Sequence, residues 1–80
     1  MTEADIYAGL TAIFRDIFDD ETITLTPETT ADDVEGWDSF NHINLIVSAE
    51  ARFGVKFKSA EVEELKNVDE FVQLIKRQVG

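Results

Sequence analysis

Apolar side chains recur every three or four residues in three separate segments of this chain, and this spacing restricts its fold more than any other feature. In a helix of about 3.6 residues per turn, the spacing places those side chains on one face. A chain of 80 residues is long enough for one small core in which such faces meet. We therefore expect residues 1–80 to form a single all-α domain. It would be a small helical bundle of three main helices and one short helix, with a long first loop.

The two N-terminal segments each have a recognisable start. The first predicts a helix capped by Thr2 that runs to about Phe18, and the second predicts a helix from Ser39 to about Phe53, ended by Gly54. Their expected core faces consist of Ile6, Leu10, Ile13, Phe14 and Ile17 in the first helix and Ile43, Ile46, Ala49 and Phe53 in the second.

The C-terminal part of the chain predicts a short helix and a last long one. Ser59 is suited to cap a short helix over residues 60–65, after a connector that turns Val55 and Phe57 inward. Asn67, with Glu70 three residues later, predicts a capping-box-like start to the last helix. The apolar face of that helix would comprise Val68, Phe71, Val72, Leu74, Ile75 and Val79.

Residues 19–38 show no helical period, and they carry eight acidic side chains without a basic one. Long loops in small domains are generally functional or packed by their own side chains, so we expect this loop to be ordered, with a short turn at Pro27–Thr30. The side chains available to pack are Ile23, Leu25, Val34 and Trp37. The acids lack the spacing of an EF-hand, so we interpret them as a solvated run, with calcium sensing as an alternative.

Composition excludes several classes of function. A net charge of −10 repels nucleic acid and anionic lipid surfaces, and the longest apolar run is too short to span a membrane. The sequence also shows no secretory signal, so we expect a cytoplasmic monomer whose partners are proteins with basic patches. Because the chain has no cysteine, any thiol chemistry must come from a cofactor.

An enzymatic role is not supported by the candidate catalytic residues. Asp38, Ser39 and the only histidine, His42, lie too close together on one helix to adopt the geometry of a catalytic triad. We expect His42 to be structural or to line a pocket. No metal site is expected.

Ser39 is nevertheless placed where a phosphate ester would be stabilised. The start of a helix has unsatisfied backbone N–H groups and the positive end of the helix dipole, and Asp38 could cap those amides. Taken alone, the Asp38-Ser39 pair also describes an ordinary helix cap. A second apolar stripe on this helix, formed by Phe40, Val47 and Ala51 beside Asn44, suggests a docking patch.

The order of elements and the stretch Gly36-Trp37-Asp38-Ser39-Phe40 resemble the acyl carrier proteins and related phosphopantetheine-binding carriers. The resemblance covers nearly the whole chain. It continues through Ile43-x-Leu45-Ile46, Glu50, Phe53-Gly54, Val55-x-Phe57, the short acidic segment 60–65 and Asn67-Val68.

The resemblance implies a specific modification. A phosphopantetheinyl transferase would recognise the region of Asp38 and attach 4′-phosphopantetheine from coenzyme A to Ser39 through a phosphodiester. The terminal thiol would then carry an acyl or related group as a thioester. The second helix would be the recognition face for acyl ligases or synthases with basic patches, which would meet Phe40, Asn44, Val47, Glu50 and Ala51.

The second helix departs from carriers of general fatty acid synthesis, which usually show several carboxylates along it. This chain keeps mainly Glu50 and has Asn41, Asn44, Ala51 and Arg52 nearby. It thereby resembles stand-alone carriers of a dedicated fatty-acid-like, lipid or secondary-metabolite pathway.

The sequence leaves open two other classes of protein and the role of one set of bulky residues. A peptidyl or aminoacyl carrier shares the fold but commonly has a Gly-Gly-[His/Asp]-Ser element, which is not seen here. An unmodified acidic helical interaction module would use Ser39 only as a cap. A set of bulky residues either lines an acyl pocket or fills the core, namely Ile43, Ile46, Phe53, Val62, Leu65 and Phe71.

Overall fold

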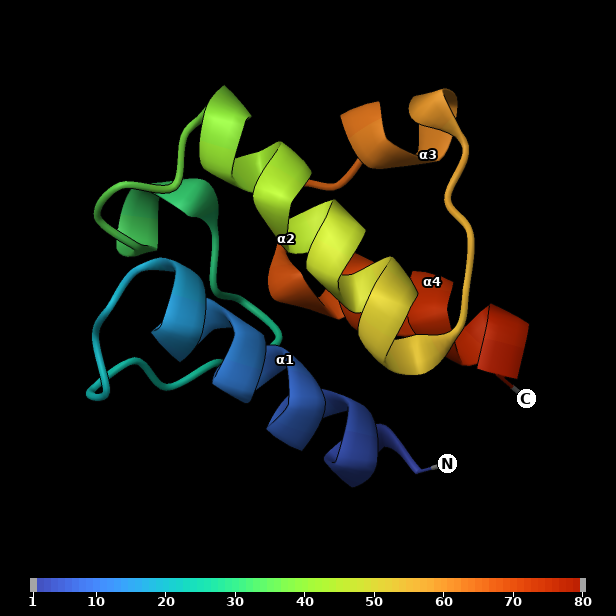
Figure 1. Ribbon diagram of the computed structural model, residues 1–80, viewed down its shortest axis with the longest axis horizontal. Coiled ribbons are helices and arrows are strands. Elements are labelled where there is room, and N and C mark those ends of the chain that lie inside the picture. Colours follow the sequence, from blue (N-terminus) through green and yellow to red (C-terminus); the bar gives the residue numbers. More distant parts are fainter. Residues whose placement is uncertain (1, 80) are drawn as a thin grey trace.

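The computed structural model describes residues 2–79, which form four α-helices and no strand. These helices are α1 (Glu3–Ile17), α2 (Ser39–Phe53), α3 (Ser59–Glu63) and α4 (Val68–Val79). Figure 1 shows α1 and α2 side by side with α4 behind α2, while the short α3 lies apart from α1. The expected bundle of three main helices, one short helix and a long first loop is confirmed.

The start of α1 follows the sequence prediction. The Asp5 amide donates to the Thr2 side-chain oxygen at 3.2 Å, and the Thr2 amide donates to the Asp5 carboxylate at 3.0 Å. This reciprocal capping box satisfies two amides that would otherwise lack partners, and its hydrogen bonds lower the pKa of Asp5. Three apolar side chains of α1, those of Ile6, Leu10 and Phe14, are fully buried.

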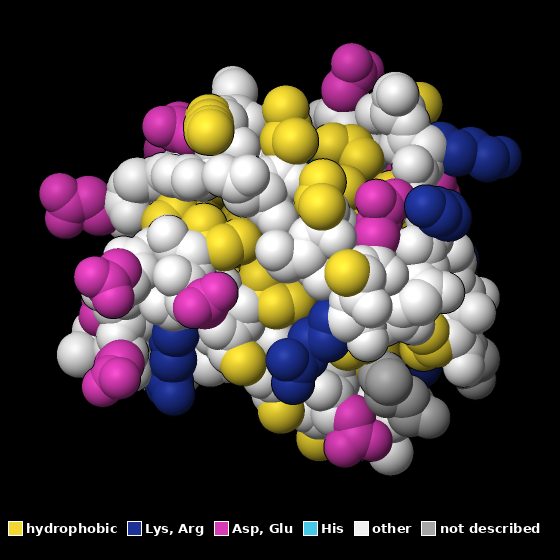
Figure 2. All heavy atoms as spheres, viewed as in Figure 1, with side chains coloured by type: hydrophobic (Ala, Val, Ile, Leu, Met, Phe, Trp, Pro, Cys, Tyr) yellow, Lys and Arg dark blue, Asp and Glu magenta, His cyan; other side chains and the backbone are white. Residues whose placement is uncertain are grey.

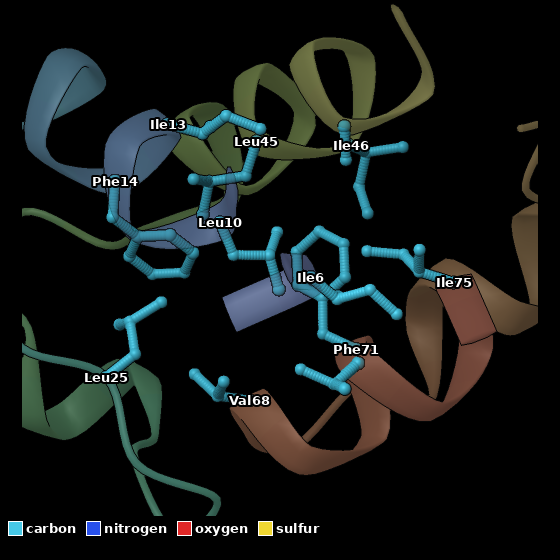
Figure 3. Packing of buried hydrophobic residues seen from close by; sticks show 12 residues of the cluster. Ile6, Leu10, Ile13, Phe14, Leu25, Leu45, Ile46, Val68, Phe71 and Ile75 are labelled. Carbon is cyan, nitrogen blue, oxygen red and sulfur yellow. The ribbon is translucent and has the colours of Figure 1, made fainter. Parts of the chain in front are cut away.

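The core lies where α1, α2 and α4 meet. Figure 3 shows side chains of these three helices pointing to a common centre, joined by Leu25 of the long loop. Phe71 of α4 is fully buried, and its ring meets Phe57 edge to face with centroids 6.0 Å apart. Val55 is also buried, so the connector before α3 turns inward as expected.

The long loop is ordered by its own contacts and by α4. Leu25 and Val34 are buried, and the predicted turn closes through a hydrogen bond from the Thr29 amide to the Thr26 carbonyl at 3.1 Å. The Thr29 carbonyl then accepts from the Val68 amide at 2.9 Å, so the loop helps to cap α4. A single 3₁₀ turn over Ala31–Asp33 follows, which the sequence analysis did not predict.

The predicted core face of α2 is wrong at one position. Ile43 was expected in the core but is 60% exposed, whereas Leu45, which was not assigned to it, is fully buried. On a helix, Leu45 shares the inward face with Ala49, and Ile43 shares the outward face with Phe40 and Val47. Packing against α1 selects the first of these faces.

The boundaries of the short helix also differ from the prediction. α3 begins at Ser59, with Lys58 rather than Ser59 as the cap, and it ends at Glu63 instead of residue 65. The start of α4 agrees with the prediction, because the Asn67 side chain accepts from the Glu70 amide at 2.9 Å. The Glu70 carboxylate, however, accepts from the Lys66 amide and not from that of Asn67.

Candidate functional site

The N-terminus of α2 presents an exposed serine beside free backbone donors. Asp38 is the cap, and its carboxylate accepts from the Asn41 amide at 2.9 Å, which confirms the predicted capping role. Ser39 is the first helical residue and is exposed. Within residues 2–79, the amides of Ser39 and Phe40 have no hydrogen-bond acceptor. These two donors and the helix dipole favour a negatively charged group at this position.

The loop enters α2 through a defined turn. Gly36 has a φ of 89°, a backbone conformation that residues with a side chain rarely adopt. Its carbonyl accepts from the Asp38 amide at 3.0 Å and from the Asn41 side-chain amide at 2.7 Å. The turn is thereby tied to the first turn of α2, and this fixes the position of Ser39.

His42 joins three parts of the molecule. The Trp37 indole N–H donates to His42 Nδ1 at 3.1 Å, so Nδ1 is the acceptor and the proton of the neutral ring is on Nε2. Nε2 lies 3.2 Å from the Val62 carbonyl of α3, to which it donates. Both ring nitrogens of His42 therefore serve structural contacts, in agreement with the structural role predicted for it.

Trp37 packs against two rings at the same place. Its ring stacks on His42 with centroids 6.0 Å apart, and it meets Phe14 of α1 edge to face at 5.1 Å. Trp37, the residue before the Asp38-Ser39 pair, is thus anchored to the core directly and to α3 through His42.

Replacement of His42 by alanine should destabilise the domain by about 1–3 kcal/mol, because the Trp37 donor and the Val62 acceptor both lose their partner. Chemical denaturation followed by circular dichroism measures the change. The fluorescence of Trp37, the only tryptophan, should shift in the folded variant. A Trp37→Phe variant keeps the contact with Phe14 and should lose less stability than His42→Ala. Equal losses of stability for the two variants would contradict the bridging role of His42.

An open groove of about 810 Å³ begins at Asp38 and Ser39 and runs between α2 and α3. The bulky residues left open by the sequence divide into two sets. Four of them line the groove, namely Ile43, Ile46, Val62 and Leu65. Phe53 does not line it, and Phe71 is fully buried in the core. A flexible arm on Ser39 would therefore have an apolar surface directly beside it.

The outward face of α2 carries the other predicted site residues. Phe40 and Val47 are 64% and 58% exposed, and Ala51 is exposed on the same face. Asn44 is half-buried, and its side chain donates to that of Asn41 at 3.2 Å. Figure 2 shows hydrophobic side chains gathered over α2 and between α2 and α3.

Two details of this face were not seen in the sequence. Ile43 belongs to the exposed stripe, although its spacing of three from Phe40 and four from Val47 could have shown it. Glu50 is half-buried, and its carboxylate accepts from the Phe57 amide at 2.8 Å. Its side chain therefore holds the connector before α3.

Two other kinds of feature are absent from the described part of the chain, namely a cluster of metal ligands and a membrane-spanning helix. In residues 2–79, histidine, aspartate and glutamate side chains do not gather into a group of three that could hold a metal ion. None of the helices described there has the length and apolar character needed to cross a membrane. The fold and the α2 terminus define a small helical domain that displays an exposed serine at the start of α2, beside a groove with apolar side chains.

Comparisons with known proteins agree with this description. The sequence profile described as "Phosphopantetheine attachment site" matches residues 8–75. The chain is 34% identical over 74 residues to the acyl carrier protein of Myxococcus xanthus, covering 92% of this chain and 94% of that protein. It is also 34% identical over 74 residues to the acyl carrier protein of Micrococcus luteus, covering 92% and 91%.

A solved structure gives the same result. The solution structure of the holo acyl carrier protein from Geobacter metallireducens superposes with a TM-score of 0.85 at 45% identity, covering 91% of this chain and 84% of that one. The chain belongs to the acyl carrier protein family. It is accordingly a carrier that bears a 4′-phosphopantetheine arm, and the family acts with phosphopantetheinyl transferases and acyl-handling enzymes.

The residues at the start of α2 fit this prosthetic group. An exposed serine hydroxyl is the acceptor that a phosphodiester needs, and the free amides of Ser39 and Phe40 suit its negative charge. When bound, the group supplies the thiol that this cysteine-free chain lacks.

Proposed function

We propose that Ser39 carries the phosphopantetheine arm, with Asp38 as the helix cap that transferases recognise beside it. The single observation that supports this assignment is the position of Ser39, which is exposed as the first residue of α2, at the mouth of the groove. Its hydroxyl is accessible to an enzyme, while Asp38 keeps the surrounding backbone in helical geometry.

The modification exchanges the phosphoanhydride bond of coenzyme A for a phosphodiester bond to Ser39. Ser39 Oγ attacks the phosphorus next to the pantetheine portion of coenzyme A and forms a new P–O bond. The P–O bond to the nucleotide breaks, and adenosine 3′,5′-bisphosphate leaves. The hydroxyl proton passes to a base of the transferase, since both ring nitrogens of the nearby His42 are already engaged.

The loaded arm would serve a dedicated pathway for fatty-acid-like, lipid or secondary-metabolite intermediates. Residues 1–80 act in this proposal as one monomeric carrier domain in the cytoplasm. Acyl ligases or synthases would meet the outward face of α2, which displays Phe40, Val47 and Ala51 with Asn44 beside them. The limited number of carboxylates on α2 supports a specialised partner set.

Intact mass spectrometry tests the attachment. The purified protein is measured before and after incubation with coenzyme A and a broad-specificity phosphopantetheinyl transferase. We expect a gain of one phosphopantetheinyl group, which peptide mapping places on Ser39. Failure to gain mass while a control carrier is modified in the same tube would reject the attachment with that transferase and favour an unmodified interaction module.

A further inference from the structure

The exposed apolar stripe of α2 is the most unusual surface feature of the domain. The exposed large hydrophobic side chains of residues 2–79 are Phe40, Ile43 and Val47, with exposed fractions of 64%, 60% and 58%. Spacings of three and four residues place all three on one face of α2. The stripe starts one residue after Ser39, so a protein that handles the arm would meet it.

Charges contribute little to this face. α2, which the structure describes from end to end, contains only two side chains with a formal charge, those of Glu50 and Arg52. The Glu50 carboxylate already accepts from the Phe57 amide at 2.8 Å and is half-buried. Arg52 lies over Gly9 of α1. The outward face of α2 therefore offers no carboxylate free of an internal contact.

The acidic side chains are concentrated elsewhere. Residues 19–38 carry eight of them and precede Ser39, so the negative charge lies before α2 in the chain and not along it. Asp38 and Glu63 line the groove at one edge of the stripe, so a row of lysines or arginines along α2 would lose water and meet carboxylates mainly at that edge, which is unfavourable. An apolar surface placed there would bury Phe40, Ile43 and Val47.

We infer that the enzymes docking on α2 present an apolar, weakly charged hollow that receives Phe40, Ile43 and Val47, in place of a row of cations that pairs with carboxylates. This inference rests on the proposed function, because it concerns partners of the arm on Ser39. The sequence led us to expect a basic patch on those enzymes, and the inference gives them an apolar surface where they contact α2. The affinity would come mainly from buried apolar area, and Glu50 would contribute through the fold alone.

Three variants separate apolar from ionic docking, with the broad-specificity transferase as the probe and KM for the carrier as the measured quantity. Val47→Ser removes an apolar contact from an exposed position and should raise KM about tenfold. Val47→Leu keeps the contact and should stay within about twofold of wild type. Glu50→Gln removes the charge but retains an oxygen acceptor for the Phe57 amide, and KM should again change less than about twofold. Circular dichroism checks that each variant is folded.

The outcomes distinguish the inference from the proposed function. A rise in KM for Glu50→Gln that equals or exceeds the rise for Val47→Ser would overturn apolar docking, as would an unchanged KM for Val47→Ser. A dimer in sedimentation analysis that Val47→Ser dissociates would also overturn it, because a second copy would then cover the stripe. If wild type and all variants gain no mass on Ser39, the proposed function itself has failed.

Discussion

Replacement of Ser39 by alanine should abolish uptake of the phosphopantetheinyl group and leave the domain folded. Alanine has no oxygen to accept the phosphodiester. The helix cap belongs to Asp38, whose carboxylate holds the Asn41 amide at 2.9 Å, so α2 keeps its start. Because Ser39 is exposed, stability should change by less than about 0.5 kcal/mol. Intact mass after incubation with coenzyme A and a transferase measures uptake, and thermal unfolding by circular dichroism measures stability.

Two other serines provide matched controls. Ser48 lies on α2, and Ser59 lines the groove, so both share part of the environment of Ser39 but neither begins α2. Ser48→Ala and Ser59→Ala should gain one phosphopantetheinyl group as wild type does. Uptake by Ser39→Ala would refute the assignment, and loss of uptake in Ser59→Ala alone would move the attachment to α3.

Local signals in the sequence account for the helices and their starts. The three long helices follow from apolar residues at helical spacing, and the caps at Thr2, Asp38 and Asn67 all make the hydrogen bonds that their side chains predict. The position of Ser39 at the start of α2 follows from the Asp38 cap. The position of Ser39 at the mouth of a groove does not follow from the sequence. The other wall of that groove is α3, which is 20 residues away in the sequence.

The core face of α2 could not be assigned from spacing alone. Apolar residues occur on more than half of its circumference, so a stripe through Ile43 and Ile46 and a stripe through Leu45 and Ala49 are both consistent with a helical period. The choice depends on which face of α2 packs against α1. The result places Ile43 outside, where it completes the apolar stripe next to Ser39.

Contacts between distant residues were also hidden in the sequence. The bond from His42 to the Val62 carbonyl spans 20 residues, and the bond from the Phe57 amide to Glu50 depends on the return of the chain after Gly54. The position of His42 on the same helix as Ser39 indicated a structural or pocket-lining role but not which groups it joined. For Glu50, the resemblance to acyl carrier proteins suggested a partner contact, and only the fold reveals the hydrogen bond of its carboxylate to the Phe57 amide.

Replacement of Phe71 by alanine should destabilise the domain strongly. The ring is fully buried in α4 and meets Phe57 edge to face, so its removal loses apolar contacts and leaves a cavity. Such substitutions cost about 3–5 kcal/mol. For a domain of this size, that loss lowers the melting temperature by at least about 12 °C. Thermal unfolding by circular dichroism measures the shift.

Phe40→Ala removes the same ring from a position that is 64% exposed, and it is therefore the matched control. Its stability should change by less than about 0.5 kcal/mol. Its KM with the transferase should rise, because Phe40 belongs to the apolar stripe of α2.

Phe71→Ala would show the reverse pattern, with normal modification of Ser39 at temperatures where it stays folded. Equal melting temperatures for the two variants would contradict the placement of Phe71 in the core. An unchanged KM for Phe40→Ala would instead remove this ring from the docking surface, so the two measurements separate what holds the domain together from what its partners contact.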